Sequence, residues 1–419
     1  MDREAAGGTL VIGGGFAGGY VARLLGKRGA TIVSPENFML YTPMLPEAAS
    51  GTLEPRHVVV PLRMMCPRAE LLLGHAVALD AKAQRVQVET GEGLFHVHYR
   101  DLVVALGSVS RTLPIPGLAE HGLGFKSLAD AIYLRNHVLL RLEAAVAASS
   151  DAQLRRELTF VFIGAGYAGV EALAELSDLV RDALRYYRLL RNAPQRWVLV
   201  DAAPKILPEI PRGLGDYAAA QLTRRGVEIY TRTTLESAEP HAVALSNGER
   251  ILTSTLVWTA GVRANPALSQ FGLPLDDRGR VLVDSSLRVE GHMNTWALGD
   301  GARVPNAATP GESDPPTCQH ALRQARRLAK NLAHGETRVY RYRMLGQVAT
   351  LGRYKGIADV LGLRLRGFPG WFVTRTYHLY QLPLMSRRLR VVADWTTSLF
   401  FRRDIAELSM LGHPQRLDP

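Results

Sequence analysis

The sequence predicts an α/β protein made of two similar three-layer units, each a parallel sheet with helices on both faces, and a separate C-terminal region. An apolar run, a glycine-rich turn, a helical pattern and a second apolar run follow one another at residues 9–33 and again at residues 158–201. Unbroken apolar runs are typical of strands in a buried parallel sheet, and the recurrence indicates an internal duplication. The C-terminal region is indicated by a third observation, because aromatic and basic residues alternate from residue 367 onward.

The second unit has the more complete motif. Its glycine turn, residues 164–169, reads GAGYAG, and its second apolar run ends on Asp201. The three glycines allow a tight turn, the approach of a pyrophosphate to the backbone, and close packing of helix on strand. The first N–H groups of the helix attract phosphates, and Asp201 can accept hydrogen bonds from both hydroxyls of a ribose. The order of these features favours a dinucleotide site over a purely structural turn.

Asp201 lies further from the turn than the usual ~20 residues, and we expect an inserted or extended helix at residues 179–192 to account for the difference.

The first unit repeats the motif, with GGGFAG at residues 13–18. Ser34 stands where the ribose-binding acid is expected, and Glu36 follows two residues later. We expect Glu36 to bind the ribose; the alternative is a solvated surface glutamate. Two such motifs in one chain predict two bound dinucleotides in two Rossmann-like domains.

The remaining elements follow from local patterns. Residues 37–63 contain four prolines and little periodicity, which predicts a loop with short helices. Apolar strands at residues 101–106 and 255–258 each run into small residues that let a cofactor lie against the backbone. Further elements are expected as a small antiparallel sheet at residues 77–99, a helix at 128–148, a strand at 294–298 ending in Gly299-Asp300, and a helix at 317–333.

Composition and charge narrow the class of protein. The 419 residues are 47% hydrophobic and 21% charged, the ordinary range for a globular protein of two or three domains. No run of about 18 apolar residues could span a membrane, and no signal-peptide pattern opens the chain, so we expect a cytoplasmic location. The two cysteines, Cys66 and Cys318, fit neither a disulfide framework nor a zinc pattern.

The net charge of +11 is concentrated near the end of the chain. Residues 364–403 contain eight arginines, no lysine and one acid, Asp394. Such an excess favours nucleic acid or an anionic membrane surface as a partner, and no nucleic-acid motif accompanies it. Two apolar, aromatic-rich stretches separated at Pro383 predict helices that lie in a membrane interface, with the arginines meeting anionic lipid. The alternative is that these helices pack on the protein itself or form a homodimer face.

Seven motifs follow one another along the chain, at residues 13–18, 41–46, 104–107, 164–171, 258–263, 298–300 and 316–319. In their order, these motifs resemble those of the two-dinucleotide-binding flavoproteins, and within them the type II NADH:quinone oxidoreductases. The resemblance covers nearly the whole chain. It implies FAD in a first domain (residues 1–120 and 290–335), NADH in a second (121–289), and a C-terminal region (336–419) on the cytoplasmic face of the membrane beside a quinone. The implied reaction passes a hydride from NADH to FAD and then two electrons to the quinone, without proton pumping.

The resemblance also implies roles for single residues. Asp300 would bind the flavin ribityl chain, Glu171 would lie where nicotinamide and quinone approach the flavin, and Cys318 and Gln319 would border the quinone end. Glu171 and Gln319 are the candidate catalytic residues, although an acid in the first turn of a helix also favours the helix dipole regardless of catalysis. No metal site is expected. The predicted cofactor-binding residues are Gly13, Gly15, Phe16, Ala17, Gly18, Ser34, Glu36, Pro43, Val77, Ala105, Gly107, Gly164, Gly166, Tyr167, Ala168, Gly169, Asp201, Ala260, Gly261, Gly299, Asp300, Cys318 and Gln319.

The chain departs from the family pattern at Arg323, where a second glutamine is usual, and in a more polar tail.

Related architectures serve other functions. Disulfide reductases need a C-x-x-x-x-C pair, which is absent, and sulfide:quinone reductases need two well-placed cysteines. A ferredoxin or rubredoxin reductase would use a protein acceptor, and a redox-sensing module would be reduced once and stop. His57, His320 and His378 have no partner that the sequence identifies.

Overall fold

The computed structural model describes residues 2–408, which fold into two compact units. Unit 1 contains residues 2–41, 59–109 and 262–344, and unit 2 contains residues 42–58, 110–261 and 345–408. The chain therefore passes between the units five times, and neither unit is a continuous stretch of sequence. The three domain ranges expected from the sequence remain a prediction; residues 345–408 fold as part of unit 2.

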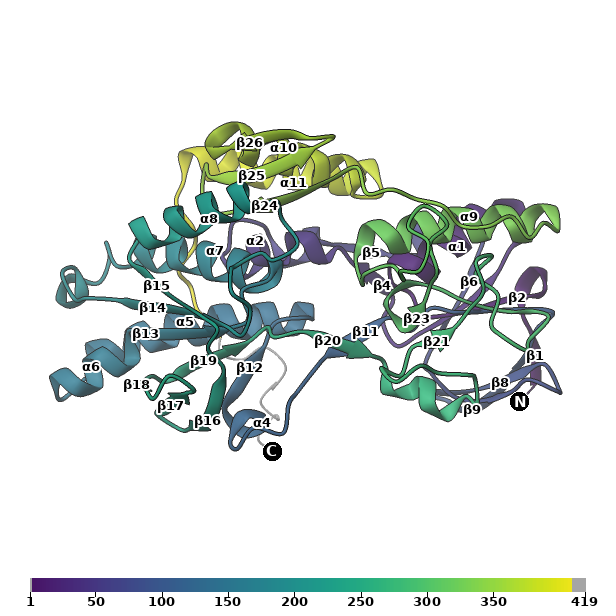
Figure 1. Ribbon diagram of the computed structural model, residues 1–419, viewed down its shortest axis with the longest axis horizontal. Helices are drawn as coiled ribbons and strands as arrows, with labels where there is room; N and C mark the ends of the chain where they lie inside the picture. The colour runs from purple at the N-terminus through teal and green to yellow at the C-terminus, as the bar shows by residue number, and fades with distance from the viewer. Residues whose placement is uncertain (1, 409–419) are drawn as a thin grey trace, which may run out of the picture. The chain divides into compact units, whose positions relative to one another are not determined.

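Unit 1 is built on a parallel sheet of five strands in the order β22-β10-β2-β3-β6. All four residues of β2 are buried, as expected for an apolar strand inside a parallel sheet. Helices α1 and α9 pack against each other, and Figure 1 shows them above the sheet, with a four-stranded sheet, β1-β9-β8-β7, below. The strands of the parallel sheet and the two helices are β2 (Thr9–Ile12), β3 (Thr31–Ser34), β6 (Glu70–Leu73), β10 (Asp101–Val104), β22 (Thr295–Ala297), α1 (Phe16–Leu25) and α9 (Cys318–His334).

The four-stranded sheet confirms the small sheet expected at residues 77–99, with β7, β8 and β9 antiparallel and β1 parallel to β9. Its strands are β1 (Asp2–Glu4), β7 (His75–Asp80), β8 (Arg85–Thr90) and β9 (Gly93–His98). Smaller elements complete the unit: β4 (Phe38–Leu40), β5 (Val59–Pro61), α3 (Leu62–Met65), β11 (Ser108–Ser110), β20 (Val262–Ala264), β21 (Val281–Leu282), the 3-10 turn η7 (Gly299–Gly301) and β23 (Ala302–Arg303).

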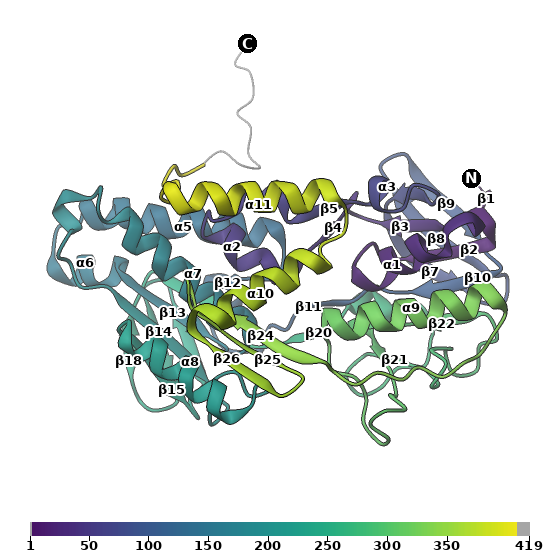
Figure 2. The same ribbon diagram turned by 90° about the horizontal axis from the view of Figure 1, so that it is seen from above.

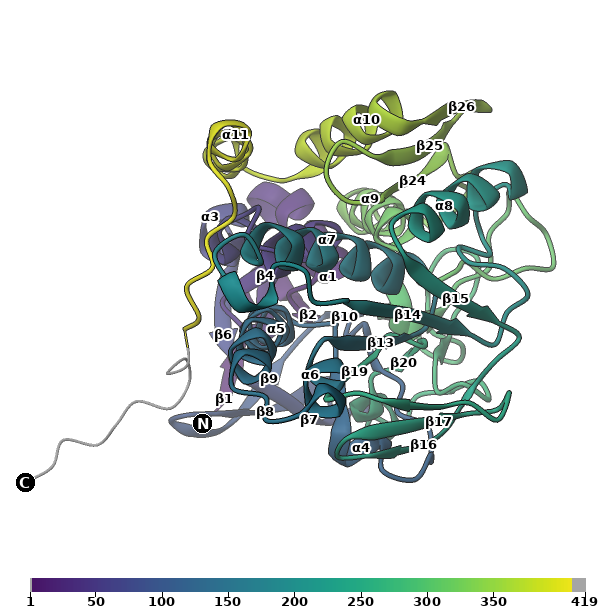
Figure 3. The same ribbon diagram turned by 90° about the vertical axis from the view of Figure 1, so that its left-hand side faces the viewer.

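Unit 2 is a three-layer structure, which confirms the predicted fold class. Its five parallel strands run in the order β12-β19-β13-β14-β15, and Figure 3 shows α7 and α8 on one face of the sheet and α5 and α6 on the other. The elements are α5 (Leu128–Val146), α6 (Asp151–Glu157), α7 (Tyr167–Ala183), α8 (Arg212–Arg224), β12 (Gly122–Gly124), β13 (Thr159–Ile163), β14 (Arg196–Asp201), β15 (Val227–Thr231) and β19 (Thr255–Trp258). Short elements join it: α2 (Leu45–Ala49), α4 (Leu118–His121), β16 (Leu235–Glu239), β17 (Ala242–Leu245) and β18 (Arg250–Leu252).

The end of the described chain adds a small antiparallel sheet and two helices to unit 2. Helix α10 packs on this sheet, as Figure 2 shows. Helices α10 and α11 are separated at Pro383, as the sequence predicts. Of the residues in α11 only Val391 is buried. The elements are β24 (Gly346–Thr350), β25 (Gly356–Val360), β26 (Leu363–Arg366), α10 (Gly367–Gln381) and α11 (Met385–Phe400).

One local prediction was incomplete and another was wrong. Residues 37–63 contain the β4–β5 pair besides short helices, because strands 19 or more residues apart leave no local periodicity. The expected helix at residues 179–192 is only the end of α7, which stops at Ala183, followed by a single 3-10 turn (Arg188–Leu190). No helix within residues 2–408 is both long and apolar enough to cross a bilayer.

Candidate functional site

The first glycine turn lies at the end of β2, against the end of β10. Gly13 has a φ of 107°, and a Cβ atom there would lie 2.2 Å from the carbonyl oxygen of Ala105. A Cβ atom on Gly18 would lie 2.0 Å from the carbonyl oxygen of Gly13. At Gly15, in contrast, no heavy atom lies within 4 Å of the Cβ position. The turn is closed toward the protein and open at Gly15, the shape that a bound pyrophosphate requires.

The loop that contains Asp300 reaches the same end of the sheet. The Cβ position of Gly299 lies 3.1 Å from the Cβ atom of Ala17 in α1. Asp300 accepts a hydrogen bond of 2.6 Å from the hydroxyl of Ser108, the residue after Gly107. Unit 1 therefore brings together the glycine turn, the small residues after β10, and Asp300, all predicted as FAD-binding residues.

Gln324 holds this loop and was not predicted. Its side-chain oxygen accepts a hydrogen bond of 2.8 Å from the Gly299 amide, and its amide nitrogen donates to Asp314 at 2.9 Å. His320 also has partners, since its Nδ1 lies 2.8 Å from the Thr317 hydroxyl. Sequence reasoning missed Gln324 because its partners lie 25 and 10 residues away in irregular segments.

Five further residues predicted to bind a cofactor lie in less distinctive places. Ser34 is buried at the end of β3, and Glu36 is exposed in the following turn. Val77 lies at a bulge of β7. Pro43 belongs to the short 3-10 turn Thr42–Met44 in unit 2. The ring of Phe16, at the start of α1, packs 5.5 Å from that of Tyr41.

The second glycine turn is closed in the same way in unit 2. A Cβ atom on Gly164 would lie 2.7 Å from the Ala260 amide, and one on Gly169 would lie 1.9 Å from the Gly164 carbonyl oxygen. Gly166 is the N-cap residue of α7, whose first two residues are Tyr167 and Ala168. No heavy atom lies within 4 Å of the Cβ position of Gly166. The turn thus meets the strand end that carries Ala260 and Gly261.

Asp201, at the end of β14, reaches this turn directly. One carboxylate oxygen accepts a hydrogen bond from the Ala165 amide, and the other accepts one of 2.7 Å from the Ala203 amide. The side chain is therefore fixed beside the glycine turn, where an adenosine ribose lies in Rossmann-type sites.

Glu171 lies one turn into α7 and is 8% exposed. Its Oε1 accepts hydrogen bonds from the amide of Thr350 at 2.8 Å and from its hydroxyl at 3.3 Å. Burial raises the pKa of the Glu171 carboxyl to about 8, the bonds from Thr350 act in the opposite direction, and the charges of Glu175 and Glu47 raise it further. The carboxyl therefore holds a proton at neutral pH, a property common among catalytic acids.

This shift predicts a pH-dependent stability. The folded chain keeps the Glu171 proton up to about pH 8, whereas an unfolded glutamate loses it at the ordinary value of 4.5. The folded state thus binds more protons between these values, and the contribution of Glu171 lowers the free energy of unfolding by about 1.4 kcal/mol per pH unit as pH rises. We expect Glu171→Gln, measured by urea unfolding, to match wild type near pH 4 and to be the more stable protein at pH 8. A constant difference across this range would contradict the assignment.

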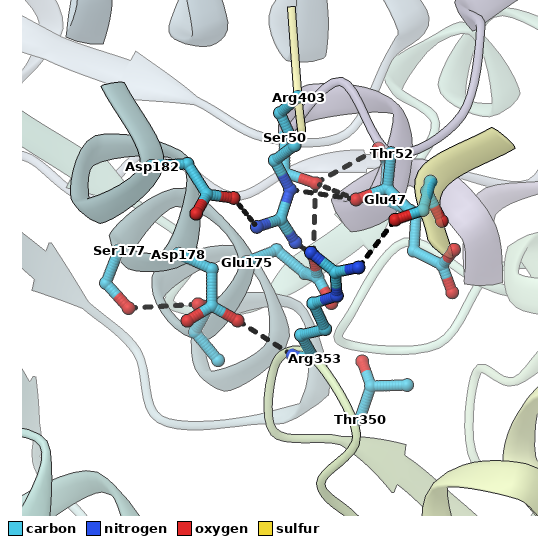
Figure 4. A network of polar contacts seen from close by, with 12 residues as sticks. Glu47, Ser50, Thr52, Glu175, Ser177, Asp178, Asp182, Thr350, Arg353 and Arg403 are labelled. Atoms are coloured by element: carbon cyan, nitrogen blue, oxygen red, sulfur yellow. Dashed lines mark hydrogen bonds and ion pairs between the residues drawn. The ribbon is translucent and has the colours of Figure 1, made fainter. Parts of the chain in front are cut away.

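A buried ionic cluster joins α2, α7 and the end of the described chain (Figure 4). Glu175 accepts hydrogen bonds from Arg403 at 2.8 Å and from the Ser50 hydroxyl at 3.1 Å. Glu47 accepts a bond of 3.1 Å from Arg375 and one of 2.6 Å from the Trp395 indole. Only 6% of the Arg403 side chain and 10% of the Arg375 side chain are exposed.

The cluster corrects two expectations. Arg375 and Arg403 were predicted to meet lipid, but they are buried because each neutralises a buried carboxylate. His57, which had no identified partner, lies 2.6 Å from Asp394 of α11. None of these three pairings has a sequence signal, since the partners lie more than 200 residues apart.

The two thiols lack the character of redox cysteines. Burial raises the pKa of Cys66 to about 11 and that of Cys318 to about 12, and the charge of Asp300 adds to the second shift. Reactive cysteines need the opposite, a pKa lowered toward neutrality. Both thiols remain protonated at neutral pH, which disfavours a sulfide:quinone reductase.

The predicted quinone end is a polar corner of unit 1. Cys318 and Gln319 begin α9, and the Gln319 side-chain oxygen accepts a hydrogen bond of 3.1 Å from the Tyr342 hydroxyl. The guanidinium of Arg323 lies 5.3 Å from the centre of the Tyr342 ring. No group of three metal-ligating side chains occurs in the described part of the chain.

Comparison with known proteins agrees with this geometry. The family model for pyridine nucleotide-disulphide oxidoreductases matches residues 8–325. The chain is 30% identical to an internal alternative NAD(P)H-ubiquinone oxidoreductase of Solanum tuberosum, over 95% of this chain and 88% of that protein. It is 29% identical to a type II NADH:quinone oxidoreductase of Mycobacterium tuberculosis, over 96% of this chain and 89% of that protein.

A solved structure extends the similarity to the fold. The Plasmodium falciparum NDH2, determined in complex with NADH, superposes with a TM-score of 0.86 at 18% identity, covering 95% of this chain and 99% of that one. The matches span both glycine turns and the loops that close them. The chain belongs to the pyridine nucleotide-disulphide oxidoreductase family, and within it to the type II NADH:quinone oxidoreductases.

Proposed function

We propose that unit 1 binds FAD and that unit 2 binds NADH. The observation that carries this assignment is the pair of glycine turns, each closed by backbone contacts and open at its middle glycine. In unit 1 Asp300 stands beside the turn for the ribityl chain, and in unit 2 Asp201 stands beside it for the ribose. When bound, FAD supplies the hydride and electron chemistry that links NADH to a quinone.

Within this chemistry the chain supplies position and protons. Glu171 is the proposed catalytic acid, because its buried carboxyl holds a proton at neutral pH and reduction of a quinone consumes protons. Gln319 is proposed to border the acceptor, with its amide oriented by Tyr342. The family relationship supports a quinone as acceptor.

The reaction is tested with the purified protein. We expect a flavin absorbance spectrum, its loss on addition of NADH, and continued turnover when a short-chain menaquinone is added. A protein without flavin that cannot be reconstituted with FAD would overturn the proposal. Reduction by NADH without turnover would indicate a redox-sensing module instead.

The choice of electron donor follows from Asp201. Its carboxylate accepts hydrogen bonds from a 2′-hydroxyl and repels a 2′-phosphate, so NADH is preferred to NADPH. We expect Asp201→Asn to reduce the ratio of kcat/KM for NADH to that for NADPH about tenfold or more, mainly through KM. An asparagine retains one acceptor oxygen for the Ala165 amide and loses the bond from the Ala203 amide. An unchanged ratio in a folded variant would contradict this role.

We also propose that the chain binds an anionic membrane surface through α10 and α11. Exposed apolar side chains on these helices include Phe372, Leu389 and Phe400, at 56%, 62% and 79% exposure. Truncation is a poor test, because it would remove Arg375 and Arg403 from buried ion pairs. The substitutions Leu389→Ser and Phe400→Ser should instead weaken co-sedimentation with anionic vesicles. Unchanged binding, with dimerisation lost, would show that these helices form a homodimer face.

A further inference from the structure

Helix α9 of unit 1 carries a row of cations that the reaction described so far does not use. Arg323, Arg326, Arg327 and Lys330 follow Gln319 at positions i+4, i+7, i+8 and i+11. With 3.6 residues per turn, these spacings place all five side chains on one side of the helix. The other side of α9 is buried in unit 1. The row therefore begins at Gln319 and continues as a basic stripe along the solvent face of the helix.

The segment that follows α9 returns along the helix and extends this stripe. Asn331, near the end of α9, donates a hydrogen bond of 2.9 Å to the carbonyl oxygen of Arg338, and Gln319, near its start, accepts one of 3.1 Å from Tyr342. The arginines of this segment are exposed. We call the cations of the helix and of the segment the α9 basic surface: Arg323, Arg326, Arg327, Lys330, Arg338, Arg341 and Arg343.

Most of this charge has no nearby counter-charge. Between residues 318 and 344 the chain has seven Lys or Arg residues and one acid, Glu336. Glu336 pairs with Arg338 at 2.9 Å, and the other six cations form no ion pair within residues 2–408. In the basic tail, by contrast, four of the eight arginines pair with carboxylates from outside the tail: Arg364, Arg375, Arg402 and Arg403. The α9 basic surface is thus free to attract an external polyanion.

The place of Gln319 in the row indicates which polyanion this is. Gln319 is proposed to border the acceptor, and a quinone with a long apolar chain is dissolved in a bilayer. Its headgroup reaches Gln319 by a short route if the bilayer surface lies along this side of α9. Guanidinium groups pair with lipid phosphates in a matching geometry, and each basic residue near an anionic lipid surface adds to the attraction. A nucleic acid also offers phosphates, but it gives no reason for the row to begin at the acceptor.

We propose that the α9 basic surface lies on the headgroups of an anionic membrane and brings the Gln319 end of unit 1 to the bilayer. The inference rests on the proposed quinone acceptor, and it is separate from the binding proposed for α10 and α11 of unit 2. No large apolar side chain is exposed on α9, so the contact is electrostatic, without insertion, and is weakened by salt.

The first test neutralises two cations that take no part in the proposed acceptor site, Arg326→Gln with Lys330→Gln. Its matched control, Lys82→Gln with Arg278→Gln, removes the same charge from exposed positions elsewhere in unit 1. At low salt we expect the affinity of the α9 variant for phosphatidylcholine vesicles containing phosphatidylglycerol to fall about tenfold or more. The control should lose less than about threefold, and the difference should disappear at high salt.

Binding through α10 and α11 is removed separately, with Leu389→Ser and Phe400→Ser. A protein with these two substitutions should keep a salt-sensitive affinity for the anionic vesicles. Adding Arg326→Gln and Lys330→Gln should then abolish it. Equal affinities of the α9 variant and its control, in either background, would overturn the proposal. Flavin content and the urea midpoint are measured for every variant as controls of folding.

Kinetics connect the surface with the acceptor. With a water-soluble short-chain quinone and no vesicles, wild type and the α9 variant should oxidise NADH at the same rate. With a long-chain quinone dissolved in a limiting amount of anionic vesicles, the α9 variant should be slower by about fivefold or more, and saturating vesicles should restore its rate. Equal rates at limiting vesicles, despite weaker binding, would contradict access of the quinone along α9. Absence of turnover by wild type with the soluble quinone would refute the proposed function and leave the vesicle-binding result unaffected.

A short RNA or DNA duplex tests the other polyanion. We expect wild type to bind the anionic vesicles more tightly than the duplex at the same ionic strength. A duplex bound at least as tightly as the vesicles, and weakened by the same two substitutions in α9, would assign the surface to nucleic acid and overturn the membrane assignment.

Discussion

Replacing Gly169 by alanine is expected to destabilise the chain strongly and to abolish turnover with NADH. The new Cβ atom would lie 1.9 Å from the Gly164 carbonyl oxygen and 2.6 Å from the Thr259 hydroxyl. The first contact is with backbone, so no rotamer change relieves it, and α7 must move away from β13. We expect a loss of roughly 3 kcal/mol or more in the free energy of unfolding, at or above the upper end for overpacked sites.

Gly166→Ala is the matched control, because the same methyl group meets no protein atom within 4 Å. Gly166 has a φ of −75°, which alanine adopts freely, and it caps α7. The free energy of unfolding of Gly166→Ala should fall by no more than about 1 kcal/mol. Its KM for NADH should rise tenfold or more, because the methyl group occupies the space of the pyrophosphate. Urea unfolding and steady-state kinetics separate the two effects. Equal stability of the two variants would show that the packing of α7 on β13 adapts.

The second large effect is expected for Arg403→Gln. Removal of the guanidinium leaves Glu175 buried without its cation, which typically costs 3–5 kcal/mol. Burial raises the pKa of the Glu175 carboxyl, and the charge of Arg403 acts against this rise. Without Arg403 the carboxyl is more readily neutralised by a proton, so the loss of stability should be largest at high pH and smaller in mild acid.

Arg402→Gln is the control for this prediction. Arg402 carries the same charge one residue earlier, but its side chain is 43% exposed and its nitrogen lies 3.8 Å from Asp182. Exposed pairs contribute at most about 1 kcal/mol. Adding Glu175→Gln to Arg403→Gln should restore part of the lost stability, since it removes the uncompensated charge. Equal destabilisation by Arg402→Gln and Arg403→Gln would mean that only net charge matters.

The sequence predicts the sheets and the two glycine turns because their determinants are local. Strand β13 is an apolar run followed immediately by Gly164, so strand, turn and helix can be read within about a dozen residues. The same reasoning places Asp201 at the end of one strand, and the family motif places Asp300 just after the end of another strand. Each of these features depends on residues that are near neighbours in the sequence.

The features that the sequence does not predict depend on distant partners. Glu171 could be chosen from its motif, but its raised pKa arises from burial and from Thr350, 179 positions later. The arginines of the tail read as a solvent-exposed basic surface, whereas Arg403 inserts its side chain between Glu175 and Asp182. Nothing in the local pattern distinguishes Arg403 from Arg402, which is half-exposed.

The discontinuity of unit 2 constrains how the protein is made. When a ribosome has completed residue 261, all five strands of the parallel sheet of unit 2 exist, but β24 and Arg403 do not. At about 5–20 residues per second, the stretch up to Arg403 needs roughly 7 to 30 seconds. Through this interval Glu175 lacks its arginine and Glu171 lacks Thr350. Folding of unit 2 is therefore completed only after Arg403 has been synthesised, and a nascent chain released before that residue contains no finished unit 2.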